Sequence, residues 1–118
     1  MRSSSARAGG LDVGVQIIGE RRALPPGVDQ AAYRILREAL TNASRHGSGS
    51  AEIELVYGAS SLELRVSNAV PGGGTSGRAG HGIVGMRERA QLLGGTLEAG
   101  GEGNMFRVHA TLPYREAS

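Results

Sequence analysis

The sequence predicts a two-layer α/β (α+β) sandwich in which one sheet carries its helices on a single face. Three observations support this fold class. Short segments with alternating apolar residues indicate strands, two segments with a 3.6-residue apolar period indicate helices, and glycine-rich links separate them. With 118 residues, 39% of them hydrophobic, the chain is long enough for one compact domain with a modest core.

The first half of the chain predicts a tail, a strand and a helix. Residues 1–10 have no hydrophobic period and are expected to be a disordered tail or linker. Leu11 to Ile18 alternates as a half-buried strand, and residues 19–27, with two prolines, form a loop. Asp29 to His46 has the strongest helical pattern and ends before Gly47. Its apolar face consists of Ala32, Ile35, Leu36, Ala39, Leu40 and Ala43.

The second half predicts a hairpin, a long loop, a helix and two more strands. The link 58–60 is short, so the alternating segments on either side of it, 53–57 and 62–66, are expected to form an antiparallel hairpin. The segment from Asn68 to Gly80 is rich in glycine and predicts a functional loop or lid. A helix over 83–93 and strands over 96–99 and 105–112 follow. The domain is expected to span 11–114, with a tail at 115–118.

Composition excludes several classes of site. The chain has no cysteine, so disulfides, thiolate metal sites and cysteine nucleophiles are excluded, and the cytoplasm is the expected compartment. All 13 basic residues are arginine, and the lack of lysine excludes a P-loop. The arginines are scattered rather than gathered into a stripe, which argues against nucleic acid. No apolar stretch is long enough to span a bilayer, and we expect no membrane contact.

Two segments carry candidate chemistry. Glu38 and Asn42 lie one helical turn apart, on a polar stripe that is expected to oppose the apolar one. By itself this stripe is better explained as a solvated helix face with i,i+4 pairing. In Gly80 to Arg89, three glycines lead into a helix whose free N–H groups form an anion site, although a simple flexible turn has the same composition.

Taken together, these segments resemble the GHKL ATPase superfamily. Tyr33 to His46 is similar to its N box, and Gly80 to Arg89 is similar to its second glycine-rich box. The residue sequences of both motifs, and of Leu92 to Leu97 after them, resemble those of sensor histidine kinases of the nitrate/nitrite-sensor and DesK-like branch. The resemblance covers about residues 11–113. It implies a mixed, largely antiparallel sheet and the ATP-binding catalytic domain (HATPase_c) of a two-component histidine kinase.

The resemblance also implies roles for individual residues. Glu38 would be catalytic, by orienting or deprotonating the attacking group, and Asn42 would ligate Mg²⁺ on the nucleotide phosphates. Arg45, His46 and the amides near Gly82 and Gly85 would contact phosphate. The implied ATP-binding residues are Asn42, Arg45, His46, Asn68, Gly80, His81, Gly82, Ile83, Val84, Gly85 and Met86.

Partners follow from the same resemblance. The cofactors are ATP and Mg²⁺, and the phosphoryl group would pass to a histidine on a dimerisation domain of the same protein, then to a response regulator. None of the three histidines resembles that acceptor, so the chain is expected to be part of a longer protein. His46 fits interaction with the helix dipole as well as phosphate contact, His81 fits either role, and His109 is expected to face solvent.

Two departures from the family pattern leave alternatives open. Asn68 stands where the family has the adenine-binding aspartate of an Asp-x-Gly-x-Gly motif, and Val70 replaces the first glycine of that motif. Residues 101–104 lack the glycine-threonine pair found in many relatives. An amide oxygen still accepts a hydrogen bond, but without charge assistance. One alternative is therefore a degenerate interaction module that does not bind nucleotide. The other is an anti-sigma-type protein serine kinase, which has a similar N box.

Overall fold

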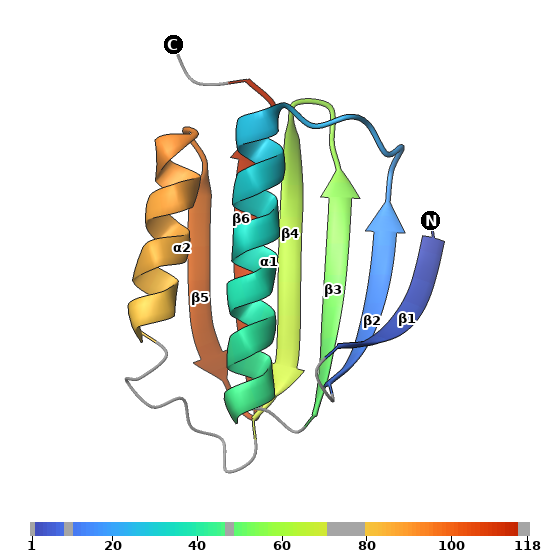
Figure 1. Cartoon of the computed structure of the whole chain (residues 1–118), viewed down its shortest axis with the longest axis vertical. Coiled ribbons are helices and arrows are strands. Elements are labelled where there is room, and N and C mark those ends of the chain that lie inside the picture. Colours follow the sequence, from blue (N-terminus) through green and yellow to red (C-terminus); the bar gives the residue numbers. More distant parts are fainter. Residues whose placement is uncertain (1, 9–10, 47–48, 71–79, 116–118) are drawn as a thin grey trace.

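The computed structural model describes residues 2–8, 11–46, 49–70 and 80–115. Two helices and six strands make up these ranges (Figure 1). In chain order they are β1 (Arg2–Ala8), β2 (Leu11–Ile18), α1 (Pro26–His46), β3 (Ser50–Tyr57), β4 (Ser61–Ala69), α2 (Gly80–Leu92), β5 (Thr96–Glu102) and β6 (Met105–Pro113).

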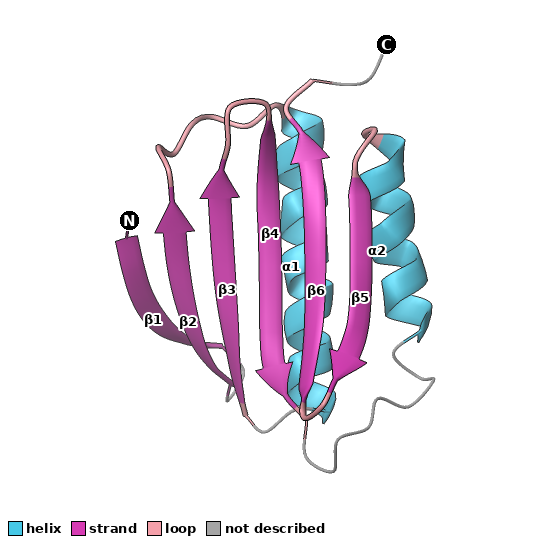
Figure 2. Cartoon of the chain, turned by 180° about the vertical axis from the view of Figure 1, so that it is seen from behind, coloured by secondary structure: helices cyan, strands magenta, loops and turns pink. Residues whose placement is uncertain are grey.

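The strands form one mixed sheet in the order β1-β2-β3-β4-β6-β5. Only β2 and β3 pair in parallel, because α1 connects them as a crossover; every other described pair is antiparallel. Both helices lie on the same face of the sheet, and the view from behind shows strands alone (Figure 2). The predicted two-layer, largely antiparallel fold is therefore confirmed.

The predicted strand at 11–18 is confirmed as β2, and the predicted hairpin is the β3–β4 pair. The helices begin earlier than expected, at Pro26 and Gly80, since proline suits a first helical turn and Gly80 leads directly into α2. Asn68 belongs to β4 rather than to a loop, and residues 71–79 of the predicted lid lie outside the described residues.

One expectation about the amino-terminal segment needs correction. Residues 1–10 were expected to lack regular structure, but β1 pairs antiparallel with β2 along its whole length, from Arg2 opposite Ile17 to Ala8 opposite Leu11. The pairing uses main-chain groups at the sheet edge, which any side chain permits. An apolar period is therefore not needed for this strand to form.

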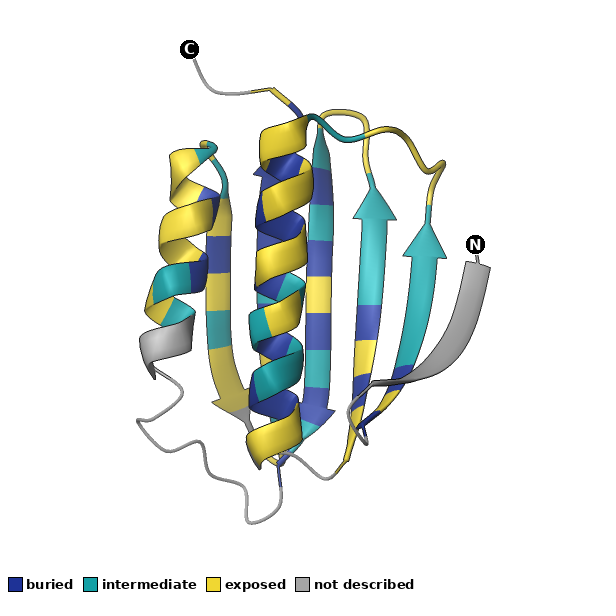
Figure 3. Ribbon diagram, viewed as in Figure 1, coloured by how far each residue is buried: buried dark blue, intermediate teal, exposed yellow. Residues whose placement is uncertain are grey.

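The core lies between the sheet and the helices. In β4 every second residue is buried, from Leu62 to Asn68, and β6 alternates in the same way from Phe106 to Leu112 (Figure 3). The most buried large side chains are Leu11, Ile35, Leu62, Leu64, Met86 and Leu112. Aliphatic residues thus supply most of the packing, as expected for a chain with few aromatic residues.

Candidate functional site

Helix α1 places Glu38 and Asn42 on the flank that faces α2. Ala31 and Arg34 of α1 line a cavity together with Arg89 and Leu93, near the carboxyl end of α2. Glu38 lies on the same side of α1 as Arg34, one turn further along the helix. The sequence suggested that this polar stripe lies opposite the apolar face of the helix. That expectation is wrong, because the stripe lies beside the apolar face. Asn42 is only 9% exposed and is one of the two buried polar residues among those described.

The Asn42 carboxamide has an unusual environment. Its Nδ2 is buried and has no hydrogen-bond partner within the described part of the chain. Such a donor is costly, because burial removes its water without replacing the lost hydrogen bond. A buried donor in this state requires an explanation, and an acceptor atom of a bound ligand would supply one.

Strand β4 supplies the second buried amide. Asn68 is 5% exposed and lies on the helix-facing side of the sheet, directly opposite Phe106 of β6. Its Nδ2 donates to the carbonyl oxygen of Ala69 at 3.3 Å. Because the oxygen and nitrogen of an amide point in different directions, Oδ1 is turned away from that carbonyl. Phe106 is a neighbour that the sequence analysis did not single out; its burial was signalled only by the alternation of β6.

The ends of two helices and one strand lie at the same end of the molecule. The carboxyl ends of α1 and β4 and the amino end of α2 all lie at the bottom of Figure 1. The first turn of α2 carries no acidic side chain, so its N–H groups and positive dipole end are not neutralised locally. The fold thus places an anion-binding helix terminus at the same end of the molecule as the two buried amides.

The remaining predicted residues occupy varied positions. In α2, Val84 is 52% exposed, Ile83 and Gly85 are half-buried, and Met86 is 2% exposed within the core. The structure thus makes Met86 a packing residue. Gly80, His81 and Gly82 form the first turn of α2, but their side-chain environment lies outside the description, as does that of His46.

Arg45 is exposed and lines a groove on the other flank of α1, the one that faces β2 and β3. Arg45 lies one turn beyond Asn42 on the same helix, and its contact with phosphate stays a prediction.

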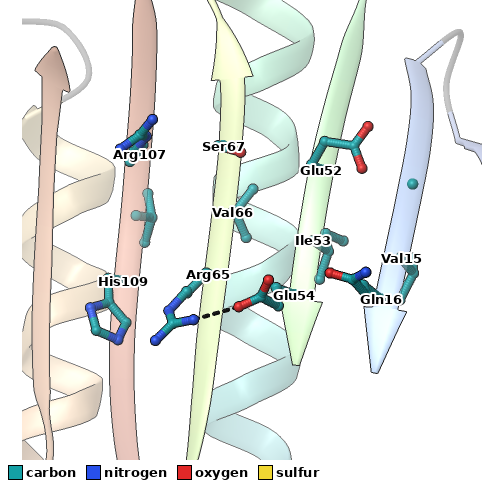
Figure 4. Close-up of a pocket in the computed structure, with 12 residues that line it drawn as sticks. Val15, Gln16, Glu52, Ile53, Glu54, Arg65, Val66, Ser67, Arg107 and His109 are labelled. Atoms are coloured by element: carbon teal, nitrogen blue, oxygen red, sulfur yellow. Dashed lines mark hydrogen bonds and ion pairs between the residues drawn. The ribbon is translucent and has the colours of Figure 1, made fainter. Parts of the chain in front are cut away.

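A further pocket lies on the opposite, helix-free face of the sheet, away from all of these residues. It has a volume of about 570 Å³ and is lined by side chains of four strands, including Gln16, Glu52, Arg65 and Arg107 (Figure 4). Arg65 forms an ion pair with Glu54 and lies 3.4 Å from Glu63, whose Oε1 is 2.9 Å from His109 Nε2. These charges are partly exposed, so each pair stabilises the fold by about 1 kcal/mol at most.

His109 matches its expected environment, since 43% of its side chain is exposed.

The described residues fit a polyanionic ligand at the α1–α2 end. The buried Nδ2 of Asn42 requires an acceptor, the amide oxygens are ligands that Mg²⁺ accepts beside water and phosphate, and the start of α2 favours negative charge. The buried amide of Asn68 offers a directional contact in an otherwise apolar strand face.

Comparison with known proteins agrees with this picture. The sensor histidine kinase YxjM of Bacillus subtilis (strain 168) is 38% identical over 90 residues, which is 75% of this chain and 22% of that protein. The chain therefore spans about a fifth of this relative. No protein-family model matches the chain.

Two solved structures share the fold. The Acinetobacter baumannii histidine kinase AdeS superposes with a TM-score of 0.67 at 15% identity, covering 86% of this chain and 53% of that one. The histidine kinase domain of the blue-light activated histidine kinase from Erythrobacter litoralis EL346 superposes with a TM-score of 0.60 at 18% identity, covering 91% and 56%. The chain is therefore a homologue of a sensor histidine kinase and has the fold of a histidine kinase catalytic domain.

Proposed function

We propose that this chain is the ATP-binding catalytic domain of a sensor histidine kinase of the nitrate/nitrite-sensor and DesK-like branch. The observation that carries the proposal is the buried, unpartnered Nδ2 of Asn42 in a chain that is 38% identical to a sensor histidine kinase. That donor lies on the flank of α1 facing α2, where the site of such a domain is expected. The domain works in the cytoplasm, within a longer protein.

Nucleotide binding follows from the two amides and the helix terminus. Asn42 contributes its Oδ1 to Mg²⁺ and its Nδ2 to a phosphate oxygen, which removes the cost of the buried donor. The N–H groups of Gly80 to Gly82 receive the negative phosphates, and Asn68 accepts a hydrogen bond from the adenine amino group. An amide lacks the charge of the family's aspartate, so we expect adenine affinity to be modest.

Phosphoryl transfer depends on positioning and on neutralising charge. Bound Mg-ATP supplies the γ-phosphoryl group, and a histidine on a dimerisation domain outside this chain accepts it. Glu38, half-buried one turn before Asn42, holds the attacking imidazole in orientation or accepts its proton. A response regulator receives the group afterwards. Without the acceptor domain, the chain alone is expected to bind nucleotide and to transfer little phosphate.

The test is calorimetric titration of ADP and a non-hydrolysable ATP analogue, with and without Mg²⁺. Three variants accompany the unmodified chain: Asn42→Ala, Asn68→Ala and the control Ser67→Ala. Ser67 neighbours Asn68 in β4 but faces the opposite side of the sheet, so its variant is expected to bind like the unmodified chain.

We expect saturable binding that loses its Mg²⁺ dependence in Asn42→Ala and weakens about tenfold or more in Asn68→Ala, as the loss of one buried hydrogen bond predicts. No binding at about millimolar nucleotide, a concentration that detects even weak sites, would favour the degenerate interaction module instead. Transfer to serine rather than histidine in a reconstituted protein would favour the anti-sigma-type kinase.

A further inference from the structure

The two helices leave part of the sheet uncovered. Helix α1 packs mainly over β4, with contacts to β3 and β6, and α2 packs over β5 and β6. No helix lies in front of β2 or the carboxyl end of β3 in Figure 3. On that side, Val15, Leu55 and Tyr57 are only half-buried, although they alternate as core residues do.

A groove of about 570 Å³ lies next to this part of the sheet, between Leu11 of β2 and Ile53 of β3 on one side and the flank of α1 on the other. Its apolar lining continues from the sheet onto the helix, where Tyr33 is 65% exposed. The apolar lining residues are Leu11, Tyr33, Leu36, Leu40 and Ile53. Leu11 and Ile53 are buried at the base of the groove, so the exposed apolar surface comes from α1. Exposed apolar surface next to polar residues is a feature of surfaces that bind partners.

The edge of the groove is positively charged. Arg37 and Arg45 line it together with Thr41 and Ser44, and all four of these residues belong to α1. No carboxylate is found among the residues that line the groove in the described part of the chain. The surface therefore combines an apolar floor with a cationic edge on one side.

We propose that this groove binds an amphipathic α-helix whose apolar stripe is flanked by acidic side chains. A third helix beside α1, at the usual 8–10 Å between packed helix axes, would complete the helix layer over β2 and β3. Its apolar stripe would cover Leu36, Leu40 and the exposed sheet, and its acidic residues would face Arg37 and Arg45. This interaction is separate from nucleotide binding on the α2 side.

Charge distinguishes this occupant from a second copy of the chain. A symmetric dimer through the groove would pair two surfaces that both carry Arg37 and Arg45 and no lining carboxylate, so neither copy would offer these arginines an acidic partner. Like charges at an interface disfavour association. The geometry therefore favours an acidic helix from another polypeptide segment over self-association.

The chain has no cysteine, so Ser44→Cys provides a single attachment point for an environment-sensitive fluorophore in the groove. The probes are two synthetic helical peptides with the same leucine stripe, one flanked by glutamate and the other by lysine. We expect a saturable fluorescence change with the glutamate peptide only. A label at Ser67→Cys, on the far face, should not respond. Calorimetry on the unlabelled chain excludes an effect of the dye.

Charge reversal provides the sharper test. Arg37→Glu is expected to weaken the glutamate peptide about fivefold or more and to strengthen the lysine peptide, because a rim attraction becomes a repulsion. Arg34→Glu, on the same helix but the α2 flank, should leave both affinities unchanged.

Equal binding of the two peptides, or an equal effect of both arginine variants, would overturn the proposal. So would stronger binding to vesicles of anionic lipid than to the glutamate peptide, or a concentration-dependent dimer that protects the Ser44→Cys label.

Discussion

At position 42, a polar side chain occupies a place that packing alone would give to an apolar one. Ala39 and Ala43 beside it are 3% and 0% exposed, and the buried Nδ2 of Asn42 has no partner among the described residues. Leaving such a donor unpaired costs about 1–3 kcal/mol of folding free energy. Stability and ligand binding therefore make opposite demands on this residue.

Asn42→Leu tests that conflict. Leucine has the same branching at Cγ without polar atoms, so the variant is expected to be as stable as the unmodified chain or about 1 kcal/mol more stable. Nucleotide binding should be lost at the same time. Urea unfolding monitored by circular dichroism measures the first effect and calorimetry the second. A destabilisation above about 2 kcal/mol would instead indicate that Asn42 is satisfied within the fold.

At the scale of the element, the glycines within α2 and directly after it have different structural roles. Its carboxyl end has Gly94 at a φ of 79°, with Gly94 N donating to Gln91 O at 3.0 Å and Gly95 N to Ala90 O at 2.8 Å. This pair of bonds is a Schellman motif, which needs a left-handed residue. Gly85, by contrast, lies inside the helix, and a Cβ there would meet nothing within 4 Å.

The two glycines should respond to alanine with opposite signs. Gly94→Ala is expected to lose about 1 kcal/mol of stability, because alanine disfavours positive φ. Gly85→Ala is expected to gain about 0.5–1 kcal/mol, because alanine is the better helix former. Thermal unfolding of both variants gives the comparison.

Gly85→Ala also bears on the site. If the backbone near Gly85 approaches phosphate, as the family resemblance implies, the added methyl group weakens nucleotide binding although the protein is more stable. Unchanged affinity would remove Gly85 from the site and leave it without a functional role.

At the scale of the whole molecule, the proposed nucleotide site and the amino-terminal strand lie at different parts of one sheet. β1 forms one edge, while β5 forms the other and contacts α2. Tyr114 links two loops to the end of β6. Its hydroxyl donates to Gly58 O at 2.9 Å, and the Arg22 guanidinium carbon lies 4.1 Å from its ring centroid. Within the described residues, neither helix is long and apolar enough to cross a membrane.

Removal of residues 2–8 tests how far β1 is integrated. The loss of its main-chain hydrogen bonds is offset by the entropy of seven ordered residues, so we expect a decrease in stability of only about 1–3 kcal/mol. Nucleotide affinity should be retained. Hydrogen exchange should show faster exchange in β2, the new edge strand. Unaltered exchange there would mean that β1 does not pair with β2 in solution.

Much of this protein was predictable because local patterns agree with the fold. Alternation in β2, β4 and β6 and the apolar period of α1 located these elements, since each must bury one face. The segments that resemble the N box and the second glycine-rich box located the proposed site, because both are local patterns, one on a helix face and one at a helix start.

Tertiary structure decided the rest. Whether the stripe of Asn42 lies opposite the core or beside it depends on where α2 packs, and the pairing of β1 depends on an open sheet edge; neither is encoded in a local period. The uncovered apolar groove likewise follows from two helices being placed over part of a six-stranded sheet. The sequence determined which residues are apolar and which can bind ligands, and long-range packing determined which of them have no partner among the described residues.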